Sequence, residues 1–549
     1  MQTLGFIGGF MANIRTTVPG SGYGSVYIDS LIWGKRAWDP ASGPITYYFG
    51  ETAADLATAN LANEHELLQL DVATLNSWNA TESNAFQYAL DLFSSVCQVT
   101  FAPVASAGTA DIVWWKTGLG DDVLGMHETP SEGQIWGYFN PNIPTYWGNL
   151  QPGGGGLTTI IHELGHALGL AHPHDGGGEP DATIFPGILW WETADRKLSQ
   201  GIWSVMSYSD GYDRAAQSPL FGGQAGLGAF DIAALQALYG ANVSTRTGDD
   251  VYELPVVNTV GTGWSCIWDV SGIDTISGVQ SSQSVVIDLR AATLATGAAG
   301  AGGFVSQAGV IGGGFTIANG VLIENATGGR GNDRLIGNSG GNALDGGRGA
   351  DRMEGGRGND TYYVNTAKDI VADTSGYDTV YTIVSYALKS AARIEVLGAA
   401  NSTAKQPIKL TGSATANTLT GNAGSNVLSG KEGHDTLIGG GGRDAFVFDT
   451  PLSRRSNVDR VVDFSVRDDT LRLDHRVFKE FEKPGFLSPA ALHITTSTRW
   501  AHDPDDRIIY NRKTGYIAYD PDGTGETAAV TFARLENGLK LKASDFYIV

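Results

Sequence analysis

Three histidines between residues 162 and 172 are spaced as the ligands of one metal ion would be. His162 and His166 are four residues apart, so on an α-helix both imidazoles lie on one face, about 2.0–2.1 Å from a shared zinc ion. His172 can join them only if the helix ends first, and Gly169 tolerates the positive φ of such an exit. Three neutral imidazoles leave one position open to water, whose pKa falls to about 7 on zinc. We therefore predict a hydrolytic zinc centre with Glu163 as its general base.

The alternative interpretation is a core helix with incidental histidines. Ile161, Leu164 and Leu168 would form its apolar stripe. A bare HExxH sequence arises by chance fairly often, whereas the longer form with a glycine and a third histidine is far more specific. The zinc interpretation is therefore favoured.

Met206 and Tyr208 follow the histidines in the segment 204–208. Together with the zinc motif and Pro173, this segment resembles the metzincin metalloproteases, and specifically the serralysins. In that family the methionine forms a turn beneath the zinc, and the tyrosine binds the metal and swings off it to steady the oxyanion. The resemblance implies a structural role for Met206, a zinc-binding and catalytic role for Tyr208, and protein or peptide substrates.

A repeat of nine residues starts at 328, 337, 346 and 355, and again at 412, 421, 430 and 439. Repeats of this kind form a parallel β-roll, in which six residues turn and bind calcium and three form a short strand. A flexible Gly/Asp linker would not hold this register, with an apolar residue two positions after the acid. We expect weaker binding where Asn stands at the sixth position. The predicted calcium ligands at that position are Asp333, Asn342, Asp351, Asp360, Asn417, Asn426, Asp435 and Asp444.

Two segments before the first array, 245–250 and 268–274, match serralysin segments that hold further calcium ions. The resemblance implies Asp269 and Asp274 as carboxylate ligands with Glu324 beside them, and it adds Arg246, Gly248 and Asp250. Residues 364–411 interrupt the repeats, so the second array could form a stack of its own. Several structural calcium ions and one catalytic zinc ion are the expected cofactors.

The composition excludes some classes of function. The net charge of −22 leaves no basic face to neutralise phosphates, so nucleic acid is not expected as a partner. Two cysteines, Cys97 and Cys266, do not make a disulfide framework. No apolar stretch is long enough for a transmembrane helix. We expect a monomer.

The two ends of the sequence bear on export. The first residues lack the basic region and cleavage site of a Sec signal. The segment 545–549, an acid followed by apolar residues, resembles the uncleaved signal of type I secretion. We therefore expect an extracellular protein of a Gram-negative bacterium, with the type I machinery as a partner and, by resemblance, a small proteinaceous inhibitor.

The expected fold is an α+β metzincin catalytic domain, then an all-β parallel roll and a β-rich C-terminal region. We predict a disordered leader or propeptide over 1–24, the protease domain over 25–243, the roll over 244–450 and the secretion region over 451–549. The predicted activity is that of a zinc endopeptidase. Two alternatives remain: a calcium-dependent surface or adhesion protein with an inactive protease fold, and a narrow-specificity processing protease.

Overall fold

The computed structural model describes residues 12–59, 72–175, 177, 180–188, 197–389, 392–497 and 501–549. It separates the chain into two compact units. The first comprises Met1–Ile276 and Val286–Ile323, and the second comprises Ser277–Val285 and Glu324–Val549. Among the described helices, none has the length and hydropathy that crossing a membrane requires.

A five-stranded sheet forms the frame of the first unit, in the order β4-β3-β5-β7-β6. Four strands run parallel, and the edge strand β6 is antiparallel to β7. The sequence pattern predicts strands over 112–115, 123–127 and 134–139, and β5, β6 and β7 confirm them, β6 in a shorter form. Their bounds are Ile45–Gly50 (β3), Phe101–Pro103 (β4), Ile112–Lys116 (β5), Gly125–His127 (β6) and Ile135–Phe139 (β7).

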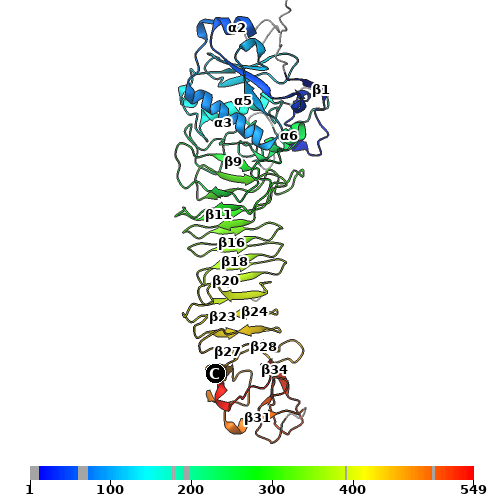
Figure 1. The fold of residues 1–549 in the computed structure, drawn as a ribbon, viewed down its shortest axis with the longest axis vertical. Coiled ribbons are helices and arrows are strands. Elements are labelled where there is room, and N and C mark those ends of the chain that lie inside the picture. Colours follow the sequence, from blue (N-terminus) through cyan, green and yellow to red (C-terminus); the bar gives the residue numbers. More distant parts are fainter. Residues whose placement is uncertain are drawn as a thin grey trace, which may run out of the picture. The chain divides into compact units, whose positions relative to one another are not determined.

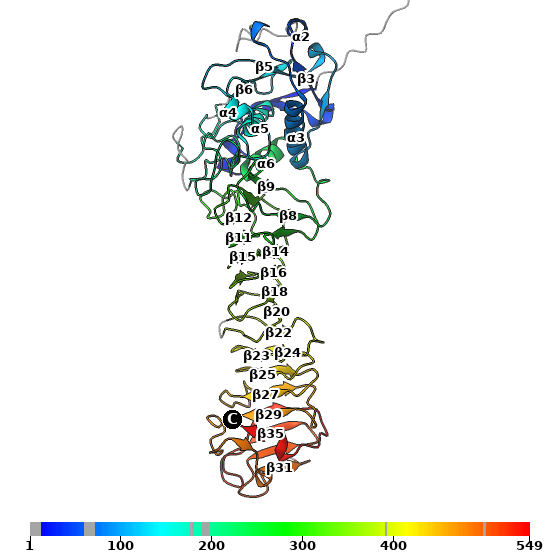
Figure 2. The same ribbon diagram turned by 90° about the vertical axis from the view of Figure 1, so that its left-hand side faces the viewer.

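Helices pack beside this sheet, as Figures 1 and 2 show. The helix α5 contacts α3, α4, β6 and β7. Asn79 and Glu82 form a capping box that fixes the start of α3, since each side chain accepts the other's backbone N–H. The helices are Val26–Asp29 (α1), Ala53–Ala59 (α2), Ala80–Val96 (α3), Pro144–Trp147 (α4), Gly155–Ala167 (α5) and Ala229–Tyr239 (α6).

The disorder predicted over 1–24 is wrong from residue 12 onward, whereas the assignment of this segment as a leader or propeptide stays a prediction. Ile14–Val18 (β1) pairs antiparallel with Lys35–Trp38 (β2), and Val18 is buried. Three of the five residues of β1 are exposed in succession and only the last is buried, so the sequence has no period-two pattern that would mark the strand. Residues 1–11 lie outside the described part of the chain.

Further strands complete the first unit. Trp264–Ile267 (β9) pairs with Gly314–Ile317 (β13), which pairs with Ser306–Ala308 (β12); Val251–Glu253 (β8) precedes them. A Cβ on Gly153 would lie 1.9 Å from the Thr262 carbonyl oxygen, so only glycine allows this approach of two backbones. Such contacts place residues 244–276 with the first unit, beyond the domain boundary predicted after 243. Thr275–Ser277 (β10) and Val285–Asp288 (β11) lie at the division between the units.

The second unit is a parallel β-roll, in which each strand pairs with the strand two repeats later. Leu335 faces Met353 and Leu344 faces Tyr362, and all four side chains are buried. These are the apolar positions two residues after each predicted ligand. The strands are Asn325–Thr327 (β14), Arg334–Ile336 (β15), Ala343–Asp345 (β16), Arg352–Glu354 (β17), Thr361–Val364 (β18), Ile370–Ala372 (β19), Thr379–Thr382 (β20), Tyr386–Ala387 (β21), Val396–Ala399 (β22), Lys409–Thr411 (β23), Thr418–Thr420 (β24), Val427–Ser429 (β25), Thr436–Ile438 (β26) and Ala445–Phe448 (β27).

Residues 364–411 continue the roll on one side and interrupt it on the other. The sheet from β14 through β18, β20 and β22 to β26 is continuous and parallel. On the opposite side, β19 ends one sheet and β21 begins another. The second array is therefore not a separate stack, because one sheet joins it to the first.

A cap of eight strands ends the second unit. Its last strand, β35, lies between β29, to which it is parallel, and the antiparallel β30, and it buries Phe546 completely. The hairpin of β32 and β33 turns between Asn511 and Tyr516, as predicted. The strands are Asp459–Val461 (β28), Thr470–Leu473 (β29), Gly485–Phe486 (β30), Leu492–Thr495 (β31), Ile508–Asn511 (β32), Tyr516–Tyr519 (β33), Val530–Arg534 (β34) and Phe546–Ile548 (β35).

Candidate metal centre and calcium-binding turns

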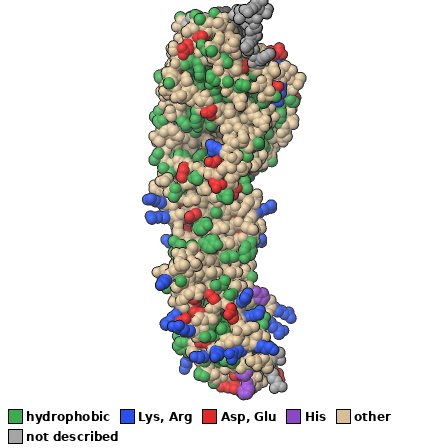
Figure 3. Space-filling view, viewed as in Figure 1, with side chains coloured by type: hydrophobic (Ala, Val, Ile, Leu, Met, Phe, Trp, Pro, Cys, Tyr) green, Lys and Arg blue, Asp and Glu red, His purple; other side chains and the backbone are tan. Residues whose placement is uncertain are grey.

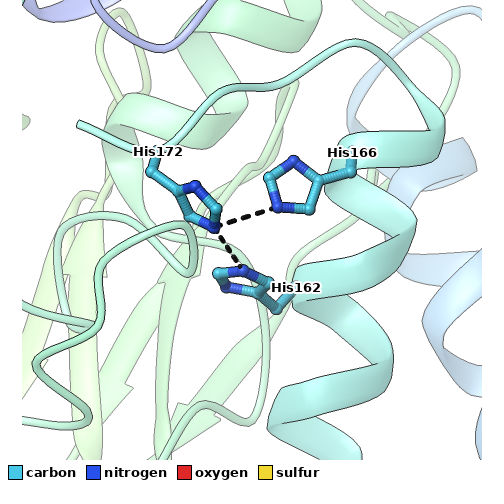
Figure 4. Close-up of side chains that lie close together, drawn as sticks. All are labelled: His162, His166 and His172. Atoms are coloured by element: carbon cyan, nitrogen blue, oxygen red, sulfur yellow. Dashed lines mark hydrogen bonds between the residues drawn. The ribbon is translucent and has the colours of Figure 1, made fainter. Parts of the chain in front are cut away.

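The three predicted zinc ligands converge, and Figure 4 shows their rings pointing at one another. His162 and His166 project from α5, which ends at Ala167, and Gly169 has a φ of 86° in the turn that returns His172. The Nε2 atom of His172 lies 3.0 Å from the Nε2 atoms of both His162 and His166. Three ligands of a tetrahedral zinc ion would be separated by about 3.3 Å, so this spacing fits a shared ion.

The opposite ring nitrogens fix the tautomers. His162 Nδ1 lies 2.8 Å from the Val205 carbonyl oxygen, His166 Nδ1 2.9 Å from that of Leu170, and His172 Nδ1 2.6 Å from Asp175 Oδ2. Because each Nδ1 donates its proton, each Nε2 presents a lone pair to the common point. Burial lowers the pKa of His162 to about 3 and that of His166 well below its ordinary value. The donor set therefore fits zinc, which binds neutral imidazoles.

Glu163 lies beside this centre and is buried, with 6% of its surface exposed. Burial raises its pKa to about 8 in the absence of metal. A Cβ on Gly125 would lie 2.8 Å from Glu163 Cγ, so the edge strand β6 passes directly over this side chain. The geometry suits a base that reaches a bound water without binding the metal.

Met206 packs beneath the zinc helix. A Cβ on Gly165 would lie 2.5 Å from the sulfur of Met206, which explains the glycine between Glu163 and His166. Met206 is completely buried. The role that the resemblance implied for it matches this packing.

Asp231 holds the methionine turn, a role that the sequence did not reveal. Its carboxylate accepts hydrogen bonds from Ser204 Oγ (2.7 Å), from the Val205 N–H (2.8 Å) and from the Gly228 N–H (2.8 Å). The sequence predicts that Asp231 caps its helix as the first residue, whereas α6 begins at Ala229 after the N-cap Gly228, and Asp231 accepts the Gly228 N–H from the third helical position. Asp231 also fixes the backbone whose Val205 carbonyl orients His162.

Tyr208 lies next to the histidines, with its ring centroid 4.5 Å from that of His172. Its side chain is 46% exposed, and burial of the remainder raises the pKa of the phenol to about 12. Tyr208 therefore keeps its proton at neutral pH and can donate it in a hydrogen bond.

Two more residues surround His172. His174 stacks on it at 5.1 Å with an angle of 8° between the rings. Burial alone would raise the pKa of Asp175, but hydrogen bonds from the ring and the backbone of His172 lower it. The ring nitrogens of His127 have partners outside the histidine cluster. Trp114 Nε1 donates a hydrogen bond to its Nε2 (3.1 Å), and its Nδ1 lies 2.7 Å from the Glu128 carbonyl oxygen. The sequence also predicts that the loop 175–200 forms a wall of the substrate cleft, and its residues Trp190 and Trp191 lie outside the described part of the chain.

The predicted calcium ligands of the roll form a ladder along each side. The N–H of Asp333 donates to Asp351 Oδ1 (2.8 Å), and that of Asn342 donates to Asp360 Oδ1 (2.7 Å). Asn417 and Asn426 donate in the same way to Asp435 and Asp444, both at 2.7 Å. Each turn is therefore tied to the carboxylate two repeats later.

The second carboxylate oxygen of these acids fits a cation. In the part of the chain that the structure describes, the buried Oδ2 atoms of Asp351, Asp360, Asp435 and Asp444 have no hydrogen-bond partner. Burial raises the pKa of Asp351 and Asp360 to about 7 and that of Asp435 and Asp444 to about 6. Carboxylate oxygens are the ligands that calcium prefers, and buried ones without a hydrogen-bond partner are suited to bind it.

The asparagines of the ladder behave differently from the aspartates. Asn342 Nδ2 donates to the Glu324 carbonyl at 3.1 Å, and Asn417 Nδ2 donates to the Ile394 carbonyl at 2.6 Å. In each of these two turns, the amide N–H is bonded to a backbone carbonyl oxygen, which is then not available to an ion. The expectation of weaker calcium binding at these turns stays a prediction, and so does the assignment of Glu324 as a ligand.

Several ladder residues were missed. The nine-residue phase, continued from Asp360, reaches Asp369 and Asp378, which accept N–H groups of Asp351 (3.0 Å) and Asp360 (2.8 Å). Their turns lack the repeated glycines, but counting by nine would have found them. Insertions then break the phase, so no spacing marks the later acceptors Glu395, Asp459 and Asp469.

The ligands implied before the arrays also converge. Asp250, Asp269 and Asp274 place one carboxylate oxygen each within 4.8 Å of the others. The Asp250 N–H donates to Asp274 Oδ1 at 2.8 Å. The Arg246 carbonyl accepts the Val270 N–H at 3.1 Å. A Cβ on Gly272 would lie 2.2 Å from the Gly248 carbonyl oxygen, so the two loops are in close contact.

Comparison with known proteins agrees with this geometry. Residues 241–401 match the family described as Peptidase M10 serralysin C terminal, and residues 411–446 match the RTX calcium-binding nonapeptide repeat. The resemblance to serralysins is confirmed. The repeats of this serralysin-like chain are thus of a calcium-binding type.

Three curated relatives illustrate the similarity. The chain is 38% identical to serralysin of Proteus mirabilis over 211 residues, 36% of this chain and 39% of the relative. It is 31% identical to the metalloprotease AprA of Pseudomonas entomophila over 293 residues, 49% of this chain and 55% of the relative. It is 29% identical to serralysin G of Dickeya chrysanthemi over 339 residues, 56% and 62% of the two chains. The chain thus spans between about two fifths and three fifths of these relatives.

Proposed function

We propose that this protein is a secreted zinc endopeptidase with a metzincin-type catalytic domain and a calcium-stabilised β-roll. The observation that carries the proposal is the convergence of three Nε2 lone pairs beside a buried Glu163. The names of the relatives, serralysin and metalloprotease, support it.

The histidines, Glu163 and Tyr208 have separate roles in the proposed reaction. A zinc ion held by His162, His166 and His172 would act as a Lewis acid and lower the pKa of water at the site. Glu163, as a carboxylate, takes a proton from the attacking water and passes it to the leaving amine. Tyr208 keeps its phenolic proton and donates a hydrogen bond to the oxyanion.

The edge strand β6 supplies a place for an extended substrate. It is the outermost strand of the sheet and passes over Glu163. A peptide that pairs with β6 would be bound mainly through its backbone, which gives affinity with little discrimination between side chains. Broad specificity is therefore favoured over the processing of a single protein.

The remaining parts of the proposal concern the cell. We propose that the roll binds several calcium ions through its carboxylate ladder, and that the protein leaves the cell by type I secretion and acts as a monomer outside it. A small proteinaceous inhibitor is a further proposed partner. These assignments are supported by the resemblance and by the RTX repeats.

Casein hydrolysis by the purified, calcium-loaded protein tests the activity. We expect hydrolysis that stops on zinc chelation and returns when zinc is added. Glu163→Ala should retain one zinc per chain yet lose about 10²–10⁴-fold in kcat, because Glu163 is a base and not a ligand. Zinc binding without hydrolysis in the wild type would instead favour an adhesion protein with an inactive protease fold.

A further inference from the structure

A hollow of about 560 Å³ lies in the second unit where the roll meets its cap. Three of its lining residues are arginines, Arg454, Arg460 and Arg534, and Tyr516 and His434 complete most of its wall. Figure 3 shows Lys and Arg side chains gathering on the C-terminal part of this unit. Such a concentration is unexpected in a chain whose net charge is −22.

The backbone places two of these charges directly side by side. Arg460 on β28 and Arg534 on β34 are register partners in neighbouring parallel strands, and both are exposed. Neighbouring strands lie about 4.7–4.9 Å apart, and like charges at opposite positions destabilise a sheet. An anion bound beside the two guanidinium groups would offset this repulsion.

No acidic side chain supplies that anion. Within the described ranges, Arg454, Arg460 and Arg534 form no ion pair and no side-chain hydrogen bond. The carboxylate in the wall, Asp459, is buried, and its Oδ1 accepts the Asp435 N–H at 3.2 Å inside the roll.

The other wall residues position the arginines. The guanidinium of Arg534 lies over the ring of Tyr516, 5.3 Å from its centroid, and this cation–π contact limits its rotation. His434 Nδ1 accepts the Val458 N–H at 3.2 Å, and its Nε2 lies 3.0 Å from the Arg455 carbonyl. His434 thereby holds the turn that carries Arg454.

We propose that this hollow is a binding site for a tetrahedral dianion, a sulfate or phosphate group. Guanidinium groups bind such oxyanions through paired N–H donors. Three guanidinium groups offer more donors than the two oxygens of a carboxylate can accept, whereas a tetrahedral group has enough oxygens. The hollow is larger than one such ion, so it has room for an ester that carries the group, such as a phospholipid headgroup.

Isothermal titration of the calcium-loaded full chain with sodium sulfate tests the proposal, with sodium acetate at equal ionic strength as the reference. We expect saturable sulfate binding that weakens as sodium chloride is added, because the site is exposed to solvent. The double variant Arg460→Gln/Arg534→Gln should bind at least about tenfold more weakly, since each guanidinium contributes charge-assisted hydrogen bonds. Acetate binding of equal strength would overturn the proposal.

The matched control is Arg334→Gln/Arg352→Gln. It removes the same charge from the second unit at two exposed arginines that are already paired with Glu354. Circular dichroism verifies that both double variants are folded. Sulfate binding that is unchanged in Arg460→Gln/Arg534→Gln, or reduced equally in the control, would overturn the proposal.

Vesicles distinguish the two sources of the group. Sedimentation with phosphatidylcholine vesicles is compared with and without phosphatidic acid. Retention on phosphatidic acid that is lost in Arg460→Gln/Arg534→Gln but kept in the control supports a site that accepts a lipid headgroup. Sulfate binding without such retention supports a site for the free anion. Failure to bind either probe would overturn the proposal.

Discussion

The proposed zinc centre and the calcium ladder hold their ligand side chains in place in opposite ways. Each histidine of the proposed zinc site is oriented by a group outside the ligand set: the Val205 carbonyl, the Leu170 carbonyl or the Asp175 carboxylate. In the ladder, the acids face one another, and the N–H of one ligand residue holds the carboxylate of the next, as between Asp333 and Asp351. The histidines are thus oriented by groups outside their site, whereas each ladder carboxylate is held by the backbone N–H of another ladder residue.

The difference predicts which ion is needed for folding. Burial lowers the pKa values of His162 and His166, so these two histidines are neutral and add no charge repulsion to the site without its ion. The ladder acids have raised pKa values because burial and neighbouring acids oppose their charge. Calcium should therefore be part of the fold of the roll, whereas zinc should be needed only for chemistry.

The largest expected effect is the loss of the roll on removal of calcium. Chelation of the full chain with EGTA should strongly reduce the far-UV β signal, because uncompensated carboxylates oppose the compact state. Selective zinc removal, with calcium kept, should abolish hydrolysis and leave the spectrum unchanged. Circular dichroism and casein hydrolysis on the same samples measure both effects. If zinc removal also unfolds the protein, the contrast between the two sites is wrong.

Within the zinc centre, Tyr208→Phe should reduce kcat by about tenfold or more while KM changes little. Its hydroxyl makes its contact with the oxyanion only in the transition state. Steady-state kinetics on a fluorogenic peptide measure the two constants. Tyr212→Phe, a tyrosine of the same unit that packs against Trp203 and Trp264, is the control and should leave both constants near wild type. An unchanged kcat in Tyr208→Phe would remove Tyr208 from the mechanism.

A smaller effect is expected from a ladder residue outside the arrays. Asp378→Asn removes one charge at a carboxylate that accepts the Asp360 N–H and whose Oδ2 is buried. We expect the thermal stability in calcium to fall by about 1–2 kcal/mol, within the usual range of single substitutions. Glu432→Gln changes an exposed acid of the same unit and should have no effect. Equal stability of both variants would confine calcium binding to the glycine-rich arrays.

The smallest effect is a dependence of the calcium-free roll on pH. Asp351 and Asp360 have folded pKa values of about 7 against an ordinary value of 3.8, so the folded state binds more protons than the unfolded state between these limits. Stability without metal should therefore fall as pH rises from about 4 to about 7. In excess calcium it should rise instead, since the ion binds deprotonated carboxylates. The far-UV β signal of dialysed, metal-free protein at pH 5 and pH 7.5 measures the sign, and a stronger β signal at pH 7.5 would contradict it.

The sequence predicts best where function depends on local spacing. His162, His166 and Glu163 belong to one helix, and the ligands of the roll repeat every nine residues, so counting along the chain finds them. Asp231 and Asp175 were missed as positioning residues because hydrogen bonds to a distant turn, or to one histidine, leave no periodic signal. The strand β1 was missed for a related reason. Its pairing with β2 is tertiary, and its sequence is mostly polar.

The strand β35 has a consequence for the order in which the second unit folds. Coils of the roll pair with neighbours 18 residues away, as Leu335 does with Met353, whereas β29 pairs with β35 across more than 70 residues. Closing a longer loop costs more chain entropy, and non-local pairings form slowly. The coils should therefore assemble first, from any point in the arrays, and the sheet of the cap should close last, when Phe546 enters its core. Until the sheet of the cap closes, the end of the roll exposes unpaired strand edges that can pair with other chains. The time that this closure takes therefore determines how long the partly folded chain can associate with others.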